Sequence, residues 1–152
     1  MELFLLRHGE AGYQEHIDAQ RELTERGTLQ LQQILRASHR ALDTVQKVWV
    51  SPYVRTQQTF AVAKGFLPPD VAVSTTELLT PEEDPLFMLG VIERANVQSA
   101  LLVTHQPLVG TLLNWLCHFA PGEHVMGTSA LAALDVDGFY QGGANLRWLR
   151  QP

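Results

Sequence analysis

The sequence predicts an α/β protein, a three-layer sandwich with a mostly parallel central sheet flanked by helices. Short apolar runs of strand length alternate with longer segments in which apolar residues recur at helical spacing. Three of these runs also end in clusters of polar residues, as strands often do at the ligand-binding edge of an open α/β sheet. At 152 residues the chain has the length of one domain, so residues 1–152 are expected to form a single unit.

The first half of the chain is expected to contain three strands and two helices. The strands are short apolar runs, whereas Leu31, Ile34 and Leu35 recur near helical spacing after a capping threonine. In chain order we expect a strand at Glu2–Leu6, a helix from an N-cap at Thr24 to about Leu42, a strand at Val48–Val50, a helix at Arg55–Lys64 and a short strand at Val71–Ser74.

The second half is expected to contain two helices and three strands. In chain order these are a helix at Pro85–Ala95, a strand at Ala100–Thr104, a hydrophobic helix at Leu108–Phe119 and strands at Leu131–Val136 and Asn145–Leu149. Glycines between the last two strands are typical of a hairpin turn. At least one terminal strand should therefore be antiparallel.

Composition excludes several classes of protein. Hydrophobic residues make up 45% and charged residues 18%, which excludes a disordered chain. The net charge of −5 argues against a nucleic-acid partner, which would require a basic face. Met1–Arg7 lacks the charge order of a signal peptide, and Pro107–Ala120 is too short to cross a bilayer. The single cysteine, Cys117, is expected to be a buried thiol without a disulfide partner, which favours the reducing cytoplasm. We also expect a monomer without a membrane partner.

Three polar segments carry the residues that could perform chemistry: Leu6–Glu10, Ser51–Thr59 and Val103–Gly110. Each begins where a predicted strand ends, so the three should converge on one crevice. Together they supply two histidines, two arginines and the starts of two helices. Arginine forks match phosphate oxygens, and helix N-termini offer free N–H groups to anions, so this set suits a phosphoryl group.

The same segments resemble the signatures of the histidine phosphatase superfamily. Those signatures are an Arg-His-Gly start at Arg7, a Ser-Pro-x-x-Arg-x-x-x-Thr segment at Ser51–Thr59, and a late strand that ends in His105. Within the superfamily, the chain resembles the SixA-type phosphohistidine phosphatases in its short length and in the segments Arg21–Gly27 and Thr128–Ala130.

The resemblance runs from Met1 to about Trp148 and implies a phosphoglycerate-mutase-like fold. It also implies that His8 is the nucleophile and that Arg7, Arg55 and His105 bind phosphate. Arg21, Ser51 and Gln106 are the expected substrate contacts.

General chemistry is compatible with these roles. A neutral imidazole nitrogen accepts a phosphoryl group when its other nitrogen is held by a hydrogen bond. The sequence does not identify that partner for His8. A lone histidine after a buried strand is more often structural, and only the Arg55 and His105 segments favour catalysis. Arg21 could instead be a surface charge, and Glu10 could be a solvated loop residue.

No metal or cofactor is expected. Four further histidines show no paired ligand spacing: His16, His39, His118 and His124. Cys117 and His118, taken with His124, do not match a zinc pattern.

The sequence contains no assignable general acid. Many superfamily members carry one after the third strand, where this chain offers Glu77, Glu82, Glu83 and Asp84. Each of these is equally typical of a solvated loop or of a helix N-terminus. A phosphohistidine can expel a neutral imidazole without an acid, whereas an alkyl phosphate expels a basic alkoxide.

The function expected is therefore that of a protein-phosphohistidine phosphatase. By resemblance, its substrates are bacterial histidine-phosphotransfer domains or phosphocarrier proteins, and free phosphate is a product. A broad small-molecule phosphomonoesterase that uses His8, with Glu77, Glu82 or Glu83 as a hidden acid, remains an alternative. A phosphate-binding module without turnover would not need a nucleophile, and a phosphoglycerate mutase would need insertions that this chain lacks.

Overall fold

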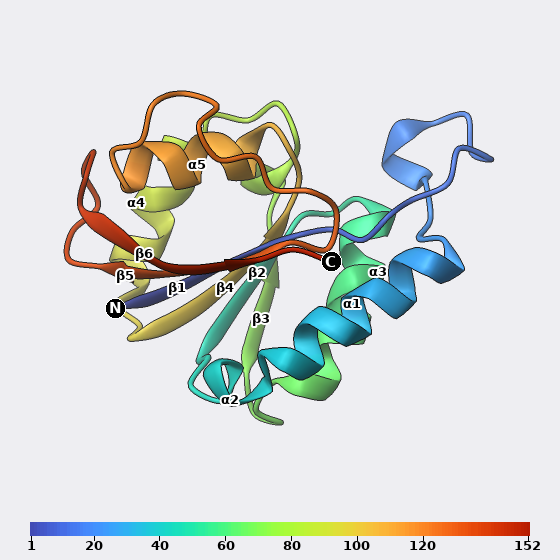
Figure 1. The fold of residues 1–152 in the computed structure, drawn as a ribbon, viewed down its shortest axis with the longest axis horizontal. Helices are drawn as coiled ribbons and strands as arrows, with labels where there is room; N and C mark the ends of the chain where they lie inside the picture. Colours follow the sequence, from blue (N-terminus) through green and yellow to red (C-terminus); the bar gives the residue numbers. More distant parts are fainter.

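The computed structural model describes residues 1–152 as a six-stranded sheet with helices on both faces (Figure 1). The strands are β1 (Glu2–Arg7), β2 (Lys47–Val50), β3 (Ala72–Thr75), β4 (Ser99–Thr104), β5 (Leu131–Val136) and β6 (Ala144–Arg150). Their spatial order is β3-β2-β4-β1-β5-β6. The pairings among the first four are parallel, whereas β5 is antiparallel to both β1 and β6. The predicted three-layer sandwich and its terminal hairpin are confirmed.

Two layers of helices enclose this sheet. The helices are α1 (Glu25–Ala37), α2 (His39–Leu42), α3 (Val54–Ala63), α4 (Pro85–Ala95) and α5 (Leu108–Leu116), with short 3-10 turns η1 (Asp18–Gln20), η2 (Lys64–Phe66) and η3 (Glu77–Leu79). Helices α4 and α5 cover one face, and α1, α2 and α3 lie on the other (Figure 1).

Strand β1 shows why a sheet of this kind forms. Leu3 and Leu5 pack into the core beneath α4 and α5, whereas Phe4 and Leu6 pack into the core beside α1 and α3. All four side chains are fully buried. Because successive residues of a strand point to opposite faces, only an unbroken apolar run can bury both faces of a central strand.

The helix predicted from Thr24 to Leu42 is interrupted. Thr24 does cap α1, since its hydroxyl accepts the Gly27 N–H at 2.9 Å. The helix then ends at Ala37, because the Ser38 hydroxyl donates to the Ile34 carbonyl and Arg150 donates to the carbonyl of Ala37. The capping of α1 by Arg150 is a tertiary contact, which helical periodicity does not reveal.

Helix α5 is shorter than predicted, ending at Leu116 instead of Phe119. The helix cannot continue because His118 has a φ of 57°, and the Gly142 N–H donates to the Trp115 carbonyl at 3.2 Å. Cys117, expected to be buried, is only half-buried, and burial raises the pKa of its thiol to about 11.

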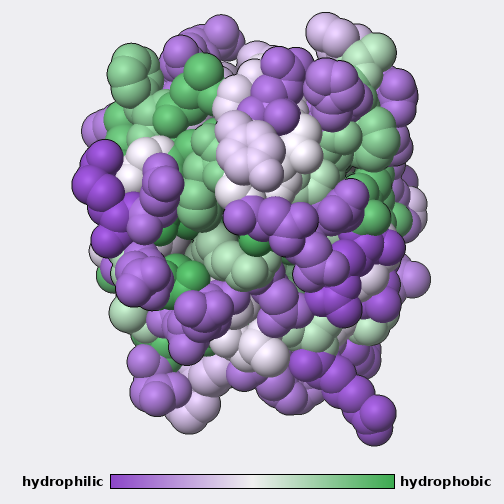
Figure 2. All heavy atoms as spheres, turned by 90° about the vertical axis from the view of Figure 1, so that its left-hand side faces the viewer, coloured by the Kyte–Doolittle hydropathy of each residue, from purple (hydrophilic) through white to green (hydrophobic).

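No helix of this structure is long and apolar enough to span a membrane. The face on the left of Figure 1, turned toward the viewer in Figure 2, shows small apolar areas separated by hydrophilic side chains. Scattered apolar residues of this kind are normal on a protein surface.

The sheet register gathers the polar strand ends at one edge. Arg7 pairs with Thr104, and Val50 pairs with Val103 in the neighbouring parallel ladder. The residues that follow these positions, His8, His105 and Ser51, therefore leave the sheet together. The convergence predicted for the three polar segments is confirmed.

Candidate active site

His8 lies at the centre of this edge, and its ring has a defined tautomer. The Nδ1 atom lies 2.7 Å from the Gly9 carbonyl oxygen, which can only accept, so Nδ1 carries the proton. The Nε2 atom is therefore the one with the free lone pair, and it receives the Arg55 Nε–H at 3.3 Å. The Gly9 carbonyl is the orienting partner that the sequence could not identify.

Arg55 projects from the first turn of α3 and is almost fully buried. Besides the bond to His8, it donates to the Asp18 carbonyl at 2.7 Å and to the Asp18 carboxylate at 3.2 Å. The same carboxylate accepts from Arg21 at 3.0 Å. Asp18 therefore bridges two arginines. Partial burial would raise the pKa of its carboxyl, but the bonds to Arg21 and Arg55 outweigh that effect and lower the pKa.

Arg7 and His105 contribute buried nitrogen atoms that have no protein partner. Arg7 donates from one terminal nitrogen to the Met126 carbonyl at 2.9 Å, while its Nε is unpaired. His105 is bonded at Nε2 to the Ser51 hydroxyl, 2.7 Å away, and its Nδ1 is unpaired. Buried polar atoms are rarely left without a partner, so these two are typical of a site that receives a hydrogen-bonding ligand.

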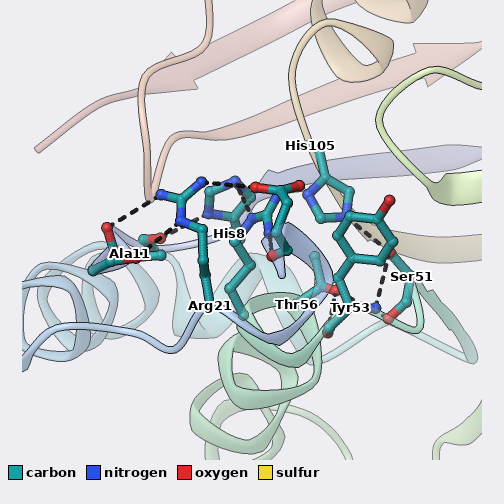
Figure 3. Close-up of polar contacts among 11 residues, drawn as sticks. His8, Ala11, Arg21, Ser51, Tyr53, Thr56 and His105 are labelled. Atoms are coloured by element: carbon teal, nitrogen blue, oxygen red, sulfur yellow. Dashed lines mark hydrogen bonds and ion pairs between the residues drawn. The ribbon is translucent and has the colours of Figure 1, made fainter. Parts of the chain in front are cut away.

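His105 stands between two other rings. Its centroid is 5.1 Å from that of His8 and 4.9 Å from that of Tyr53 (Figure 3). Ser51, expected as a substrate contact, is fully buried behind His105 and accepts the Tyr53 N–H. The Ser51 hydroxyl orients the His105 ring and does not line the pocket.

Arg21 lies on the far side of His8 from His105 (Figure 3). It donates to the carbonyls of Gly12 and Ala11, and its guanidinium stacks 4.0 Å from the Tyr13 ring centroid. These contacts hold the loop that follows His8 in place. Arg21 also lines the pocket around His8, although its guanidinium is already bonded to Asp18, Gly12 and Ala11.

The catalytic pocket has a volume of about 670 Å³ and is lined by residues from the loops after β1 and β4 and from α3. Its walls include Arg7, His8, Arg21, Arg55, Gln106 and Thr128. The expected contact Gln106 is thus in place, with its side-chain oxygen accepting the Gly110 N–H at 2.7 Å. Three arginines around one neutral histidine make this pocket a receptor for a multiply charged anion.

The environment keeps both histidines uncharged. Burial, with smaller contributions from Arg55 and Arg7, lowers the pKa of His8 to about 4. Burial and the adjacent His8 lower the pKa of His105 to about 3. At neutral pH the Nε2 lone pair of His8 is therefore not lost to a proton.

None of the four acids suggested by the sequence reaches this pocket. Glu77, Glu82 and Asp84 are exposed, and Asp84 caps α4 by accepting the Leu86 N–H. Glu10 lies on a loop with a partly exposed side chain, and it also lines the pocket and accepts from the Thr24 hydroxyl at 2.8 Å.

Asp18 is the main site residue that sequence reasoning missed. Its only signal was its position three residues before Arg21, a spacing that lets the two side chains meet. Nowhere in the structure do three or more His, Cys, Asp or Glu side chains lie close enough together to hold a metal ion.

Comparison with known proteins agrees with this geometry. A model of the histidine phosphatase superfamily (branch 1) matches residues 3–80, which include His8 and Arg55. The chain is 29% identical to the phosphohistidine phosphatase SixA of Escherichia coli (strain K12), and the alignment covers 100% of this chain and 94% of that protein. It is 34% identical to a phosphohistidine phosphatase SixA homolog of Haemophilus influenzae, over 74% of this chain and 75% of the relative.

Among solved structures, the protein histidine phosphatase SixA complexed with tungstate superposes with a TM-score of 0.87. It is 29% identical in sequence, and the match covers 100% of this chain and 97% of the other. The likeness therefore extends through all three polar segments, including the one that carries His105.

Proposed function

The chain belongs to the histidine phosphatase superfamily, and we propose that it is a protein-phosphohistidine phosphatase that works through a phosphohistidine intermediate at His8. The observation that carries this proposal is the state of His8, whose Nδ1–H is held by the Gly9 carbonyl while its Nε2 faces Arg55. The similar proteins are named phosphohistidine phosphatases, and a structure of one holds tungstate, an oxyanion like phosphate.

In the first step the Nε2 lone pair of His8 attacks phosphorus, and the P–N bond to the substrate imidazole breaks. The electron pair returns to the departing nitrogen, which leaves as a neutral ring when its other nitrogen already carries a proton. The His8 ring becomes positively charged, and its Nδ1–H bond to the Gly9 carbonyl stabilises that charge. In the second step water attacks phosphorus, and His8 leaves as a neutral imidazole.

Arg7, Arg55 and His105 are proposed to hold the phosphoryl oxygens. Phosphoryl transfer requires positioning and charge stabilisation more than covalent help, and these groups supply it. The Nε of Arg7 and the Nδ1 of His105 have no protein partner, so a bond from either atom to the phosphoryl group would break no existing bond. Arg55 must turn from Asp18 and His8 toward the phosphoryl group as the substrate enters.

A phosphohistidine fits this site better than an alkyl phosphate does, because the two have different leaving groups. Of the acids that could protonate a leaving alkoxide, Glu77, Glu82, Glu83 and Asp84 do not line the pocket, and Asp18 is held ionised by two arginines. Glu10 does line it, but its carboxylate accepts the Thr24 hydroxyl and lies beside Arg26. An imidazole leaving group needs no such acid. We propose histidine-phosphotransfer domains or phosphocarrier proteins as the partners, met in the cytoplasm, where the lone Cys117 thiol stays reduced.

The test compares kcat/KM for a chemically phosphorylated histidine-phosphotransfer domain, a phosphocarrier protein and a panel of aryl and alkyl phosphates. We expect a phosphohistidine protein to be the best substrate. A higher kcat/KM for an alkyl phosphate would favour the small-molecule phosphomonoesterase and overturn the proposal.

A further inference from the structure

A second hollow lies beside the catalytic pocket, between α5 and the loop that follows it. That loop arches above α5 and then descends to the sheet edge where β5 begins (Figure 1). The hollow has a volume of about 300 Å³ and a mostly carbon lining. We call it the α5 groove; its walls include Gln106, Gly110, Thr111, Trp115, Phe119 and Val125.

The α5 groove and the catalytic pocket meet at one residue, Gln106. Gln106 lines both, because its side chain folds back onto the start of α5. On the other side, Val125 lines the groove while the Met126 carbonyl holds Arg7 and Thr128 lines the catalytic pocket. A substrate bound at His8 therefore has the groove as its immediate neighbour.

The groove is built by specific contacts and is not a gap between mobile loops. Asn114 is buried on α5, donates to the His124 carbonyl at 3.0 Å and accepts the His124 N–H at 3.1 Å. The rings of Phe119 and His124 pack together in a tilted arrangement, with centroids 4.3 Å apart. These contacts hold the loop at a set distance from α5, so the groove exists before any partner arrives.

One strongly exposed apolar side chain lies at each of the two hollows. Val125 is 60% exposed at the rim of the groove, and Tyr13 is 84% exposed on the loop that also lines the pocket. Single exposed apolar residues are common on protein surfaces; here they would give a docked protein apolar contacts next to the charged pocket. A free phosphate ester would occupy the charged pocket alone and leave these groups in water.

We propose that the α5 groove receives an apolar side chain of the phosphohistidine-bearing protein, located next to its phosphohistidine. This inference rests on the proposed function. A docked protein covers about 800 Å² on each partner, an area that extends well beyond a catalytic pocket and includes a groove that meets it at Gln106. The volume of about 300 Å³ is at the small end for small-ligand sites, which suits one side chain.

The test separates protein recognition from chemistry with two substrates, a histidine-phosphorylated carrier protein and free phosphohistidine. Thr111→Trp fills the groove from an exposed position on α5, and Val125→Asp places a charge at its rim. Phe87→Asp is the matched control, because Phe87 is 62% exposed on α4 and lines neither hollow.

Both groove variants should lower kcat/KM for the carrier protein by about tenfold to a hundredfold, the effect of losing one buried apolar side chain. Their kcat/KM for free phosphohistidine should stay within about twofold of wild type, which also shows that they fold. Phe87→Asp should change neither value.

Two results would overturn the α5 groove proposal alone. One is unchanged kcat/KM for the carrier in both groove variants; the other is an equal fall on both substrates, which would assign the groove to a small ligand or to the pocket itself. A wild-type enzyme that hydrolyses no phosphohistidine protein would overturn the proposed function and the groove assignment with it.

Discussion

The chemistry of His8 depends on which of its ring nitrogens carries the proton. The Gly9 carbonyl can bind only an N–H, so Nδ1 is protonated and Nε2 is free. Burial then prevents Nε2 from gaining a second proton, because a charged imidazole would be poorly solvated there. The two effects together leave Nε2 without a proton at neutral pH, as the proposed role of His8 as nucleophile requires.

The first prediction concerns the titration of His8. In the free protein its ring should stay neutral as the pH falls through 6.5 and should become protonated only near pH 4, because burial and the arginines lower its pKa. The ¹⁵N chemical shifts of the imidazole, followed from pH 8 to pH 4, measure this directly. A His8 midpoint near 6.5 would contradict the proposed environment.

The second prediction concerns the roles of His8 and Arg55. His8→Ala should abolish turnover without unfolding the protein, since no phosphoenzyme can form. Arg55→Ala should lower kcat/KM, with a loss of about 3–4 kcal/mol of transition-state stabilisation. Rapid-quench detection of the phosphoenzyme and circular dichroism of each variant check both statements. More than a few per cent of residual turnover in His8→Ala would remove His8 from the mechanism.

At the scale of the element, α1 determines the position of the loop after His8. Gly27 lies in its first turn, where a Cβ would come within 2.3 Å of the Glu10 carbonyl oxygen. Thr24 caps the helix and also donates to the Glu10 carboxylate. The start of α1 and the loop at Glu10 are therefore packed backbone against backbone, which holds one wall of the catalytic pocket.

The third prediction compares two glycines inside helices. Gly27→Ala should destabilise the protein by about 1–3 kcal/mol and reduce activity, because the added methyl group must displace the Glu10 backbone. Gly90→Ala in α4 should instead raise stability by about 0.5–1 kcal/mol, since its Cβ would approach only the flexible end of Arg94. Urea unfolding of both variants measures the difference. Equal effects would show that Gly27 makes no close approach.

At the scale of the whole molecule, the sheet order brings distant segments to one edge. Strands β2, β4 and β1 are adjacent and parallel, so their carboxyl ends deliver Ser51, His105 and His8 together. The acids Glu77, Glu82, Glu83 and Asp84 do not line the pocket that results. The pocket has cations around the proposed nucleophile, and its one carboxylate, Glu10, accepts the Thr24 hydroxyl and lies beside Arg26, so we expect no proton donor there.

The fourth prediction follows from that missing donor. Across a series of phosphate esters, kcat/KM should fall steeply as the leaving group becomes more basic, with alkyl esters lower by about 10²–10⁴-fold. Phosphohistidine should lie above this line because its leaving nitrogen needs no proton. Steady-state kinetics on the series measure the slope.

Glu10→Gln tests the one carboxylate that lines the pocket, with the exposed Glu82→Gln as control. Good wild-type activity on alkyl esters, lost selectively in Glu10→Gln, would identify Glu10 as a general acid and contradict the prediction.

The sequence by itself determined the fold class and nearly every strand and helix, and it predicted that Arg7, His8, Arg55 and His105 lie together at one sheet edge. It could do so because strand and helix periodicity are local, and because polar residues directly after parallel strands must meet at one edge. Helix ends were less predictable, since Arg150 ends α1 from across the chain.

Only the tertiary structure decided the partners of these residues. Asp18 meets Arg55 across 37 positions, and Ser51 meets His105 across 54, through loops whose paths no spacing rule predicts. The same holds for the α5 groove, which requires Asn114 to hold a loop ten residues away. Side chains from separate elements meet only when packing has placed those elements, and that placement depends on the whole chain.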